Sequence, residues 1–253
     1  MAERSPSDAD LKTTGELARL EELVRTLRAR CPWDRRQTHL SLAPHLLEEA
    51  YEALEAIEEL GSPDSAVSPE VVAHLREELG DVLFQVFFHS VLAEEEGRFT
   101  LADVARDVHD KLVRRHPHVF GDALADTPEE VAARWEVLKS SEKGHKGVTG
   151  GIPDAMPALA VAAKLLRKAE LLGVDLPSVA ERRSRVSANL DRLAAAGESG
   201  SSGEESRAVG EMLLCVADLA RRIGVDPETA LRAETRGLRH ALETGERPGS
   251  ESQ

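Results

Sequence analysis

Residues 75–92 read LREELGDVLFQVFFHSVL and indicate the fold more clearly than any other stretch. Between Leu79 and Leu92 every residue has an apolar side chain except Gly80, Asp81, Gln85, His89 and Ser90. A helix that is apolar nearly all round is typical of a buried position, where an aspartate needs a partner. On a helix, polar residues at three- and four-residue spacing form one stripe, namely Glu78, Asp81, Gln85 and His89. We therefore expect this stripe to face one target.

A second acidic helix precedes this one. Residues 41–60 have helical periodicity and contain Glu48-Glu49-Ala50-Tyr51-Glu52. Glu49 and Glu52 project within about 60° of each other, and Glu78 and Asp81 do the same. If the two turns face each other, they form a cage of four carboxylates. Gly80, which costs about 1 kcal/mol in a helix relative to alanine, indicates close approach of another helix or a ligand.

The density of acids favours a cation site. From residue 45 to residue 81 there are 11 acidic residues and one base, Arg76. Like charges at this density repel unless a cation or solvent relieves them. Oxygen ligands without histidine or cysteine suit Mg²⁺ or Mn²⁺, and the Glu-x-x-His pairs of di-iron bundles are missing. Taken alone, the second helix also fits a solvated acidic face, because its apolar residues lie roughly opposite its glutamates.

The rest of the chain is predicted to be all-α. Helical periodicity recurs throughout and strand alternation is nearly missing, so we expect a helical bundle. Thr100 and Asp103 are expected to form a capping box at the start of a helix that ends at Arg115. Thr127 indicates the start of another helix, which is expected to end near Glu142. The predicted organisation starts with a disordered N-terminus (1–14) and a helical catalytic domain (15–143). A glycine-rich linker (144–153), a second helical repeat (154–243) and a disordered tail (244–253) follow.

Composition excludes several classes of protein. No apolar run approaches the roughly 20 residues of a membrane helix, and the polar start lacks a secretory signal, so we expect a cytoplasmic protein. The net charge of −14 argues against binding to a nucleic-acid polymer, which depends on lysine and arginine. Cys31 and Cys215 lie in unrelated contexts and suggest neither a disulfide framework nor a zinc site.

The second half of the chain resembles a degenerate copy of the first. Glu78-Leu79-Gly80-Asp81 is echoed by Ala208-Val209-Gly210-Glu211. The positions that correspond to the four acids are roughly Ala188, Asp191, Ala208 and Glu211, which cannot assemble a cage. We therefore predict that the second half is structural or part of a dimer interface.

The order of motifs resembles the MazG nucleoside triphosphate pyrophosphohydrolases over about residues 15–142. The resemblance rests on the segments Cys31-Pro32-Trp33-Asp34, Gln37-Thr38-His39, 47–52, 75–81, Glu96-Gly97-Arg98-Phe99 and Arg114-Arg115-His116-Pro117-His118-Val119-Phe120. It implies an all-α fold that dimerises and hydrolyses nucleoside triphosphates, ribo or deoxyribo, to the monophosphate and pyrophosphate with Mg²⁺.

Carried over residue by residue, the resemblance assigns a candidate site. The metal ligands would be Glu49, Glu52, Glu78 and Asp81. The substrate contacts would be His45, His74, Lys111, Arg114, Arg115, Trp135 and Lys139. Beside the ligand pair, Glu48 is the candidate catalytic residue that orients or activates the attacking water. His116-Pro117-His118 is expected to be a structural turn without a metal.

Two other functions, and structural roles for several of the candidate residues, stay open at the level of the residues. A non-enzymatic helical dimer could use the acidic stripe to bind a basic partner, or leave it solvated, and Glu48 could be an ordinary surface residue. Lys111, Arg114 and Arg115 could simply complement the dipole of a helix C-terminus, and Trp135 could be a packed core residue. A related phosphohydrolase could cleave at the γ-phosphate or act on a small pyrophosphate ester.

Overall fold

The fold is helical in both halves of the chain. The computed structural model describes residues 7–61, 66–128, 130–131, 134–135, 138, 150–196 and 202–245. Within these ranges the regular structure is helical and no strand occurs, which confirms the predicted all-α class. Two compact units, residues 1–136 and residues 137–253, divide the chain. None of the helices in the described ranges is long and apolar enough to cross a membrane.

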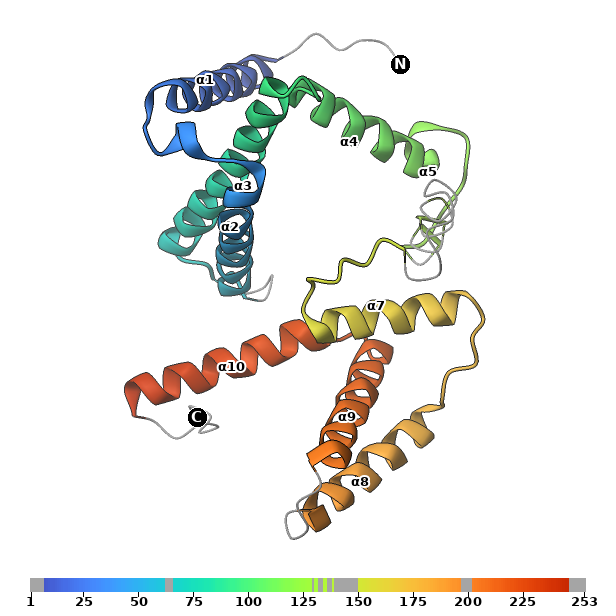
Figure 1. Ribbon diagram of the computed structural model, residues 1–253. Helices are drawn as coiled ribbons and strands as arrows, with labels where there is room; N and C mark the ends of the chain where they lie inside the picture. The colour runs from blue at the N-terminus through green and yellow to red at the C-terminus, as the bar shows by residue number, and fades with distance from the viewer. Residues whose placement is uncertain are drawn as a thin grey trace. The chain divides into compact units, whose positions relative to one another are not determined.

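A long helical hairpin forms the centre of the first unit. Its helices α2 (His39–Glu59) and α3 (Pro69–Glu95) lie side by side (Figure 1). Helix α1 (Asp8–Arg30) packs on α3 and on the 3₁₀ turn η1 (Asp34–Arg36). The pairing of α2 with α3 places the two acidic turns of the sequence on neighbouring helices.

The hydrophobic core lies toward the C-terminal half of α3. Its buried members come from α1, α2 and α3 and are Val24, Leu42, Phe87, Phe88, Val91 and Leu92. The expectation that the helix is buried nearly all round between Leu79 and Leu92 is wrong at the N-terminal end of this stretch, because Leu79 is 51% exposed and Asp81 is also exposed. The acidic turns therefore lie outside the core, where a ligand can reach them.

Arg28 fixes the start of α2 relative to α3. Its Nη1 donates to the carbonyl oxygen of Asp34 at 2.6 Å and to that of Gln37 at 3.0 Å. Its Nε and Nη2 donate to the carboxylate of Glu95 at 3.1 and 3.0 Å. One partly buried guanidinium thus joins α1, the turn before α2 and the end of α3.

Side-chain caps explain where the helices begin. Thr38 and Ser41 form a capping box at the start of α2, and Ser68 caps α3 with Pro69 in the first turn. Helix α1 begins at Asp8 because Ser7 and Asp10 form another capping box. Residues 8–14 are therefore helical, and the expectation that they belong to a disordered N-terminus is wrong.

Helix α4 (Leu101–Arg115) leads away from the α2–α3 hairpin (Figure 1). It begins at the predicted capping box, in which Thr100 and Asp103 each satisfy the other's backbone N–H. The short helix α5 (Pro117–Phe120) follows, so the expected turn at His116–His118 is the start of a helix instead. The expected helix from Thr127 to Glu142 falls largely outside the described residues.

The second unit is organised around helix α9 (Ser202–Arg222). Helices α7 (Ala158–Leu171), α8 (Val179–Ala196) and α10 (Pro227–Thr244) all contact it, and α8 and α9 form a hairpin (Figure 1). The boundary between the two units precedes the expected linker at 144–153, of which residues 144–149 lie outside the described ranges. The tail beyond residue 245 also lies outside them.

A buried ionic cluster holds the second unit together. The Asp218 carboxylate is fully buried and accepts hydrogen bonds from Arg182 Nε at 3.0 Å, Arg221 Nη2 at 2.9 Å and Arg222 Nε at 3.2 Å. Arg182 is itself buried, at the start of α8. Since each charge has a hydrogen-bonded partner of opposite sign, the cost of burying it is offset.

Candidate metal site between helices α2 and α3

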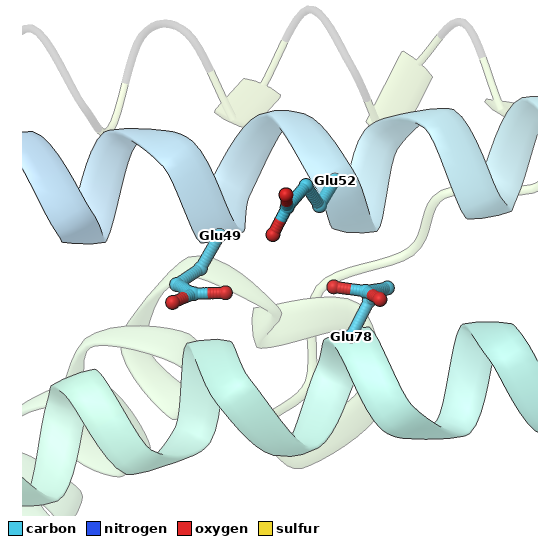
Figure 2. Close-up of side chains that lie close together, drawn as sticks. All are labelled: Glu49, Glu52 and Glu78. Atoms are coloured by element: carbon cyan, nitrogen blue, oxygen red, sulfur yellow. The ribbon is translucent and has the colours of Figure 1, made fainter.

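Three carboxylates of the hairpin converge between its helices. Glu49 and Glu52 come from one turn of α2, and Glu78 comes from the facing turn of α3. One oxygen from each lies within 4.8 Å of the oxygens of the other two. Figure 2 shows Glu49 and Glu78 reaching toward one another from the two helices, with Glu52 beside them. Opposite oxygen ligands of one Mg²⁺ ion are about 4.2 Å apart, so the upper limit of 4.8 Å is compatible with a shared ion.

The electrostatics of this carboxylate cluster favour the binding of a positive charge. Desolvation raises the pKa of Glu49, and the charges of Asp81 and Glu52 raise it further. Desolvation and the charge of Glu52 likewise raise the pKa of Glu78, while His74 opposes this shift. Both shifts mean that the ionised carboxylates are destabilised first by desolvation and then by one another. A divalent cation would remove this repulsion.

Asp81, the fourth predicted ligand, is not part of the close cluster. Its side chain lies one turn beyond Glu78 on α3 and is exposed. Its charge nevertheless raises the pKa values of both Glu49 and Glu78. The structure therefore brings three of the four acids together and keeps the fourth within electrostatic reach.

The longer polar stripe on α3 does not face a single target, contrary to expectation. Gln85 is buried beside the core, and His89 Nδ1 lies 2.8 Å from His39 Nδ1 with the two rings stacked. No described helix of the chain approaches Gly80 closely, because a Cβ atom at this position would meet nothing within 4 Å, and close approach of a ligand stays a prediction. Only the Glu78 end of the stripe faces the acidic turn of α2.

Two histidines flank the carboxylate cluster. His74 Nε2 lies 3.3 Å from the Glu78 carboxylate, and its Nδ1 lies 3.0 Å from Glu59. The hydrogen bond to Glu59 raises the pKa of His74, and the charges of Glu59 and Glu78 add to this effect. His45 Nδ1 lies 3.5 Å from the Glu48 carboxylate. Glu48 directly precedes Glu49 and is exposed, so its carboxylate is open to solvent.

The predicted phosphate-binding residues lie apart from the carboxylates within one chain. Lys111, Arg114 and Arg115 occupy the last two turns of α4, which leads away from the hairpin (Figure 1). Trp135 packs there, with the Arg115 guanidinium 5.5 Å from its ring centroid and the His116 ring at 4.8 Å. Trp135 thus contacts neighbouring side chains rather than the cluster. Lys139 lies outside the described residues.

Fold and site together define an all-α protein with a carboxylate cluster between two paired helices. The model of the MazG nucleotide pyrophosphohydrolase domain matches residues 37–120, which include the whole hairpin. The chain is 40% identical over 223 residues to the nucleoside triphosphate pyrophosphohydrolase/pyrophosphatase MazG of Thermotoga maritima, covering 87% of this chain and 80% of that protein.

Two further relatives are also named nucleoside triphosphate pyrophosphohydrolases. The nucleoside triphosphate pyrophosphohydrolase of Escherichia coli K12 is 37% identical over 207 residues, covering 80% of this chain and 75% of that protein. The Mycobacterium tuberculosis protein of the same name is 39% identical over 168 residues, covering 65% of this chain and 48% of that protein. The chain therefore belongs to the MazG family of nucleoside triphosphate pyrophosphohydrolases, which are hydrolases of phosphoanhydride bonds.

Proposed function

We propose that the carboxylate cluster holds Mg²⁺, with Mn²⁺ as a possible substitute, and that the chain hydrolyses nucleoside triphosphates to monophosphate and pyrophosphate. Ribonucleotides, deoxyribonucleotides or both are the substrates, and housekeeping of the nucleotide pool is the proposed role. The observation that carries this proposal is the convergence of three carboxylate oxygens from two helices within 4.8 Å, in a chain of this family.

The donor set fits a hard divalent cation. Glu49, Glu52 and Glu78 would hold the ion, with Asp81 joining from the next turn of α3. Among the described residues, neither Glu49 nor Glu52 is paired with a lysine or arginine, so their charges are available. A bound divalent cation neutralises phosphate charge and makes the α-phosphorus more electrophilic.

Glu48 is proposed to orient the attacking water and accept its proton. Its carboxylate is exposed and outside the close cluster, and His45 lies beside it. The water oxygen forms a bond to the α-phosphorus while the bond to the bridging oxygen of the β-phosphate breaks, and pyrophosphate leaves with that oxygen. His45, His74, Trp135 and Lys139 would contact the nucleotide, and the α4 cations Lys111, Arg114 and Arg115 would neutralise the phosphates.

We also propose that the chain acts as a homodimer. The hairpin exposes apolar side chains that include Leu47 on α2 and Val72, Leu79 and Val86 on α3. On α3 they recur every seven residues, as expected for a helix that packs on another helix. A second copy would cover them and could supply the α4 cations that lie apart from the carboxylates in one chain. Light scattering of Leu79→Glu should then give the mass of one chain, against two for the unchanged protein.

The reaction can be tested by identifying its products. The full chain is incubated with each ribo- and deoxyribonucleoside triphosphate in Mg²⁺, in Mn²⁺ and in EDTA, and the nucleotides are separated by chromatography. Monophosphate and pyrophosphate, formed only with a divalent cation, are expected. Diphosphate and phosphate would indicate cleavage at the γ-position. Absence of turnover across the panel by a folded protein would favour a non-enzymatic partner-binding role instead.

A further inference from the structure

A cavity in the second unit is lined by residues of helices α8 and α9. Its volume is about 680 Å³, within the range usual for small-molecule sites. The charged and amide side chains that line it are Arg185, Asn189, Arg192, Glu204, Arg207 and Glu211. All of them belong to the second unit, so this basic cavity is separate from the carboxylate cluster on α2 and α3.

The basic cavity occupies the place in its hairpin that the carboxylates occupy in theirs. On α9, Ala208 and Glu211 line it at the positions that match Glu78 and Asp81. On α8 the lining residues are Arg185, Ala188, Asn189 and Arg192, and Asp191 is not among them. Ala188 corresponds to one of the two metal-site glutamates of α2. Its polar neighbours in the cavity are one amide and two guanidinium groups, with no carboxylate from α8.

The contacts within the basic cavity leave guanidinium groups available. Arg207 Nε donates to Glu211 at 3.3 Å, which accounts for one opposite pair of charges. Arg192 Nη1 donates to Oδ1 of Asn189, a side chain that is only 2% exposed. Arg185 makes no hydrogen bond to another side chain among the described residues and is exposed. Glu204 is the remaining carboxylate of the lining, opposed by Arg185 and Arg192 together.

We propose that this basic cavity binds the phosphoanhydride group of a small anion through Arg185 and Arg192, without a divalent cation. Guanidinium groups match phosphate oxygens in pairs, and two of them suit a diphosphate better than a single phosphate. Of the four positions that correspond to the metal-site acids, two are alanines and Asp191 does not line the cavity, so the cation ligands and most of the repulsion of an anion are gone. Free pyrophosphate and the polyphosphate tail of a nucleotide share this chemistry.

The proposal is tested by calorimetric titration of the full chain with inorganic pyrophosphate in EDTA, where the carboxylate cluster has no cation to bind phosphate. Binding is expected for the unchanged protein, with at least a tenfold loss of affinity in the double variant Arg185→Gln/Arg192→Gln. The matched control is Arg183→Gln on the same helix, which is exposed and does not line the basic cavity. Its affinity should stay within twofold of the unchanged protein.

A second variant keeps the test decisive if the double variant fails to fold. Ala188→Glu adds a carboxylate at an exposed lining position and should weaken pyrophosphate binding at least tenfold. Glu49→Gln should leave it unchanged, which separates this site from the proposed active site. Titration with a nonhydrolysable triphosphate and with a monophosphate distinguishes the two sources of the anion. The proposal would be overturned if the unchanged protein did not bind pyrophosphate. It would also be overturned if Arg185→Gln/Arg192→Gln and the control Arg183→Gln bound pyrophosphate with equal affinity.

Discussion

The α2–α3 and α8–α9 hairpins place acidic side chains in opposite surroundings. Between α2 and α3, desolvation and neighbouring carboxylates raise the pKa values of Glu49 and Glu78. In the second unit, burial alone would raise the pKa of Asp218, but hydrogen bonds from Arg221 and Arg182 lower it below its ordinary value. Among the described residues, Glu49 is paired with no lysine or arginine and Glu78 only with His74, whereas Asp218 is fully paired.

This contrast separates a functional acid from a structural one. Acids that repel each other reduce the stability of the chain and are favoured only when an external cation joins them. An acid surrounded by three guanidinium groups stabilises the fold and has no capacity left for a ligand. A helical hairpin can therefore serve either purpose, depending on whether its own arginines reach its acids.

The largest expected effect is on catalysis. Glu49→Gln removes one charge and one ligand from the carboxylate cluster while keeping the shape of the side chain. Pyrophosphate release should fall by about 100-fold or more, because the cation is held less tightly and less well oriented. The rate is measured under saturating Mg²⁺ by chromatography of the products.

Glu77→Gln is the matched control, because Glu77 is an exposed acid on the same turn of α3 and is not in the cluster. Its rate should stay within about twofold of the unchanged protein, as for an ordinary surface substitution. If Glu49→Gln and Glu77→Gln have equal rates, the cluster does not take part in the reaction.

The next effect concerns stability. Asp218→Asn leaves Arg182, Arg221 and Arg222 without their carboxylate, and breaking such a buried pair costs about 3–5 kcal/mol. Hydrogen exchange should show faster exchange in α8 and α9 and unchanged exchange in α3. The control is Asp191→Asn, because Asp191 is an exposed acid of α8. This substitution should leave hydrogen exchange in α8, α9 and α3 unchanged. Unchanged protection of α9 in Asp218→Asn would show that the ionic cluster contributes no stability.

The pH dependence of this effect has a definite sign. Because the folded pKa of Asp218 is lowered, its contribution is fully present above the ordinary value of 3.8 and is lost as the pH falls through the lowered value. The difference in stability between the unchanged protein and Asp218→Asn should therefore shrink only at strongly acidic pH. Urea unfolding followed by circular dichroism measures it.

Local patterns in the sequence were sufficient to predict most helices. The capping box at Thr100 and Asp103 and the proline at position 69 act within one turn, so the bounds of α3 and α4 follow closely from the sequence. The start of α1 was missed although Ser7 and Asp10 carry a similar signal. The acidic spacing also indicated which residues could share a site, and the structure brings three of these four together.

Features that depend on helix packing could not be predicted in this way. The stacking of His39 on His89 joins residues 50 positions apart. The exposure of Asp81 and the open space beside Gly80 depend on how α3 is rotated against α2, which periodicity does not determine. The basic lining of α8 also depends on how that helix packs on α9, although the arginines at 185 and 192 are seven residues apart and therefore share a face.

A smaller effect is expected on the metal dependence of stability. The raised pKa values of Glu49 and Glu78 imply that, without metal, their contribution is favourable below the ordinary value of 4.5 and is lost as the pH rises through the raised values. In EDTA at neutral pH, Glu49→Gln should therefore unfold a few degrees above the unchanged protein. Mg²⁺ should stabilise the unchanged protein more and reverse the order. The same order in EDTA and in Mg²⁺ would mean that the cluster does not bind the ion.

The smallest effect is expected at Glu211, which matches Asp81 in the other hairpin. Glu211→Gln loses an ion pair with Arg207 whose side chains are 82% and 44% exposed, and such surface pairs contribute about 0–1 kcal/mol. Nucleotide hydrolysis should stay within about twofold of the unchanged rate, whereas Asp81→Asn should lower it about tenfold because its charge acts on the cluster. Pyrophosphate binding in EDTA should strengthen slightly in Glu211→Gln, since one negative charge leaves the basic cavity. If Glu211→Gln slowed hydrolysis as much as Asp81→Asn, the two hairpins would have to serve one reaction, and their division into a catalytic and an anion-binding hairpin would fail.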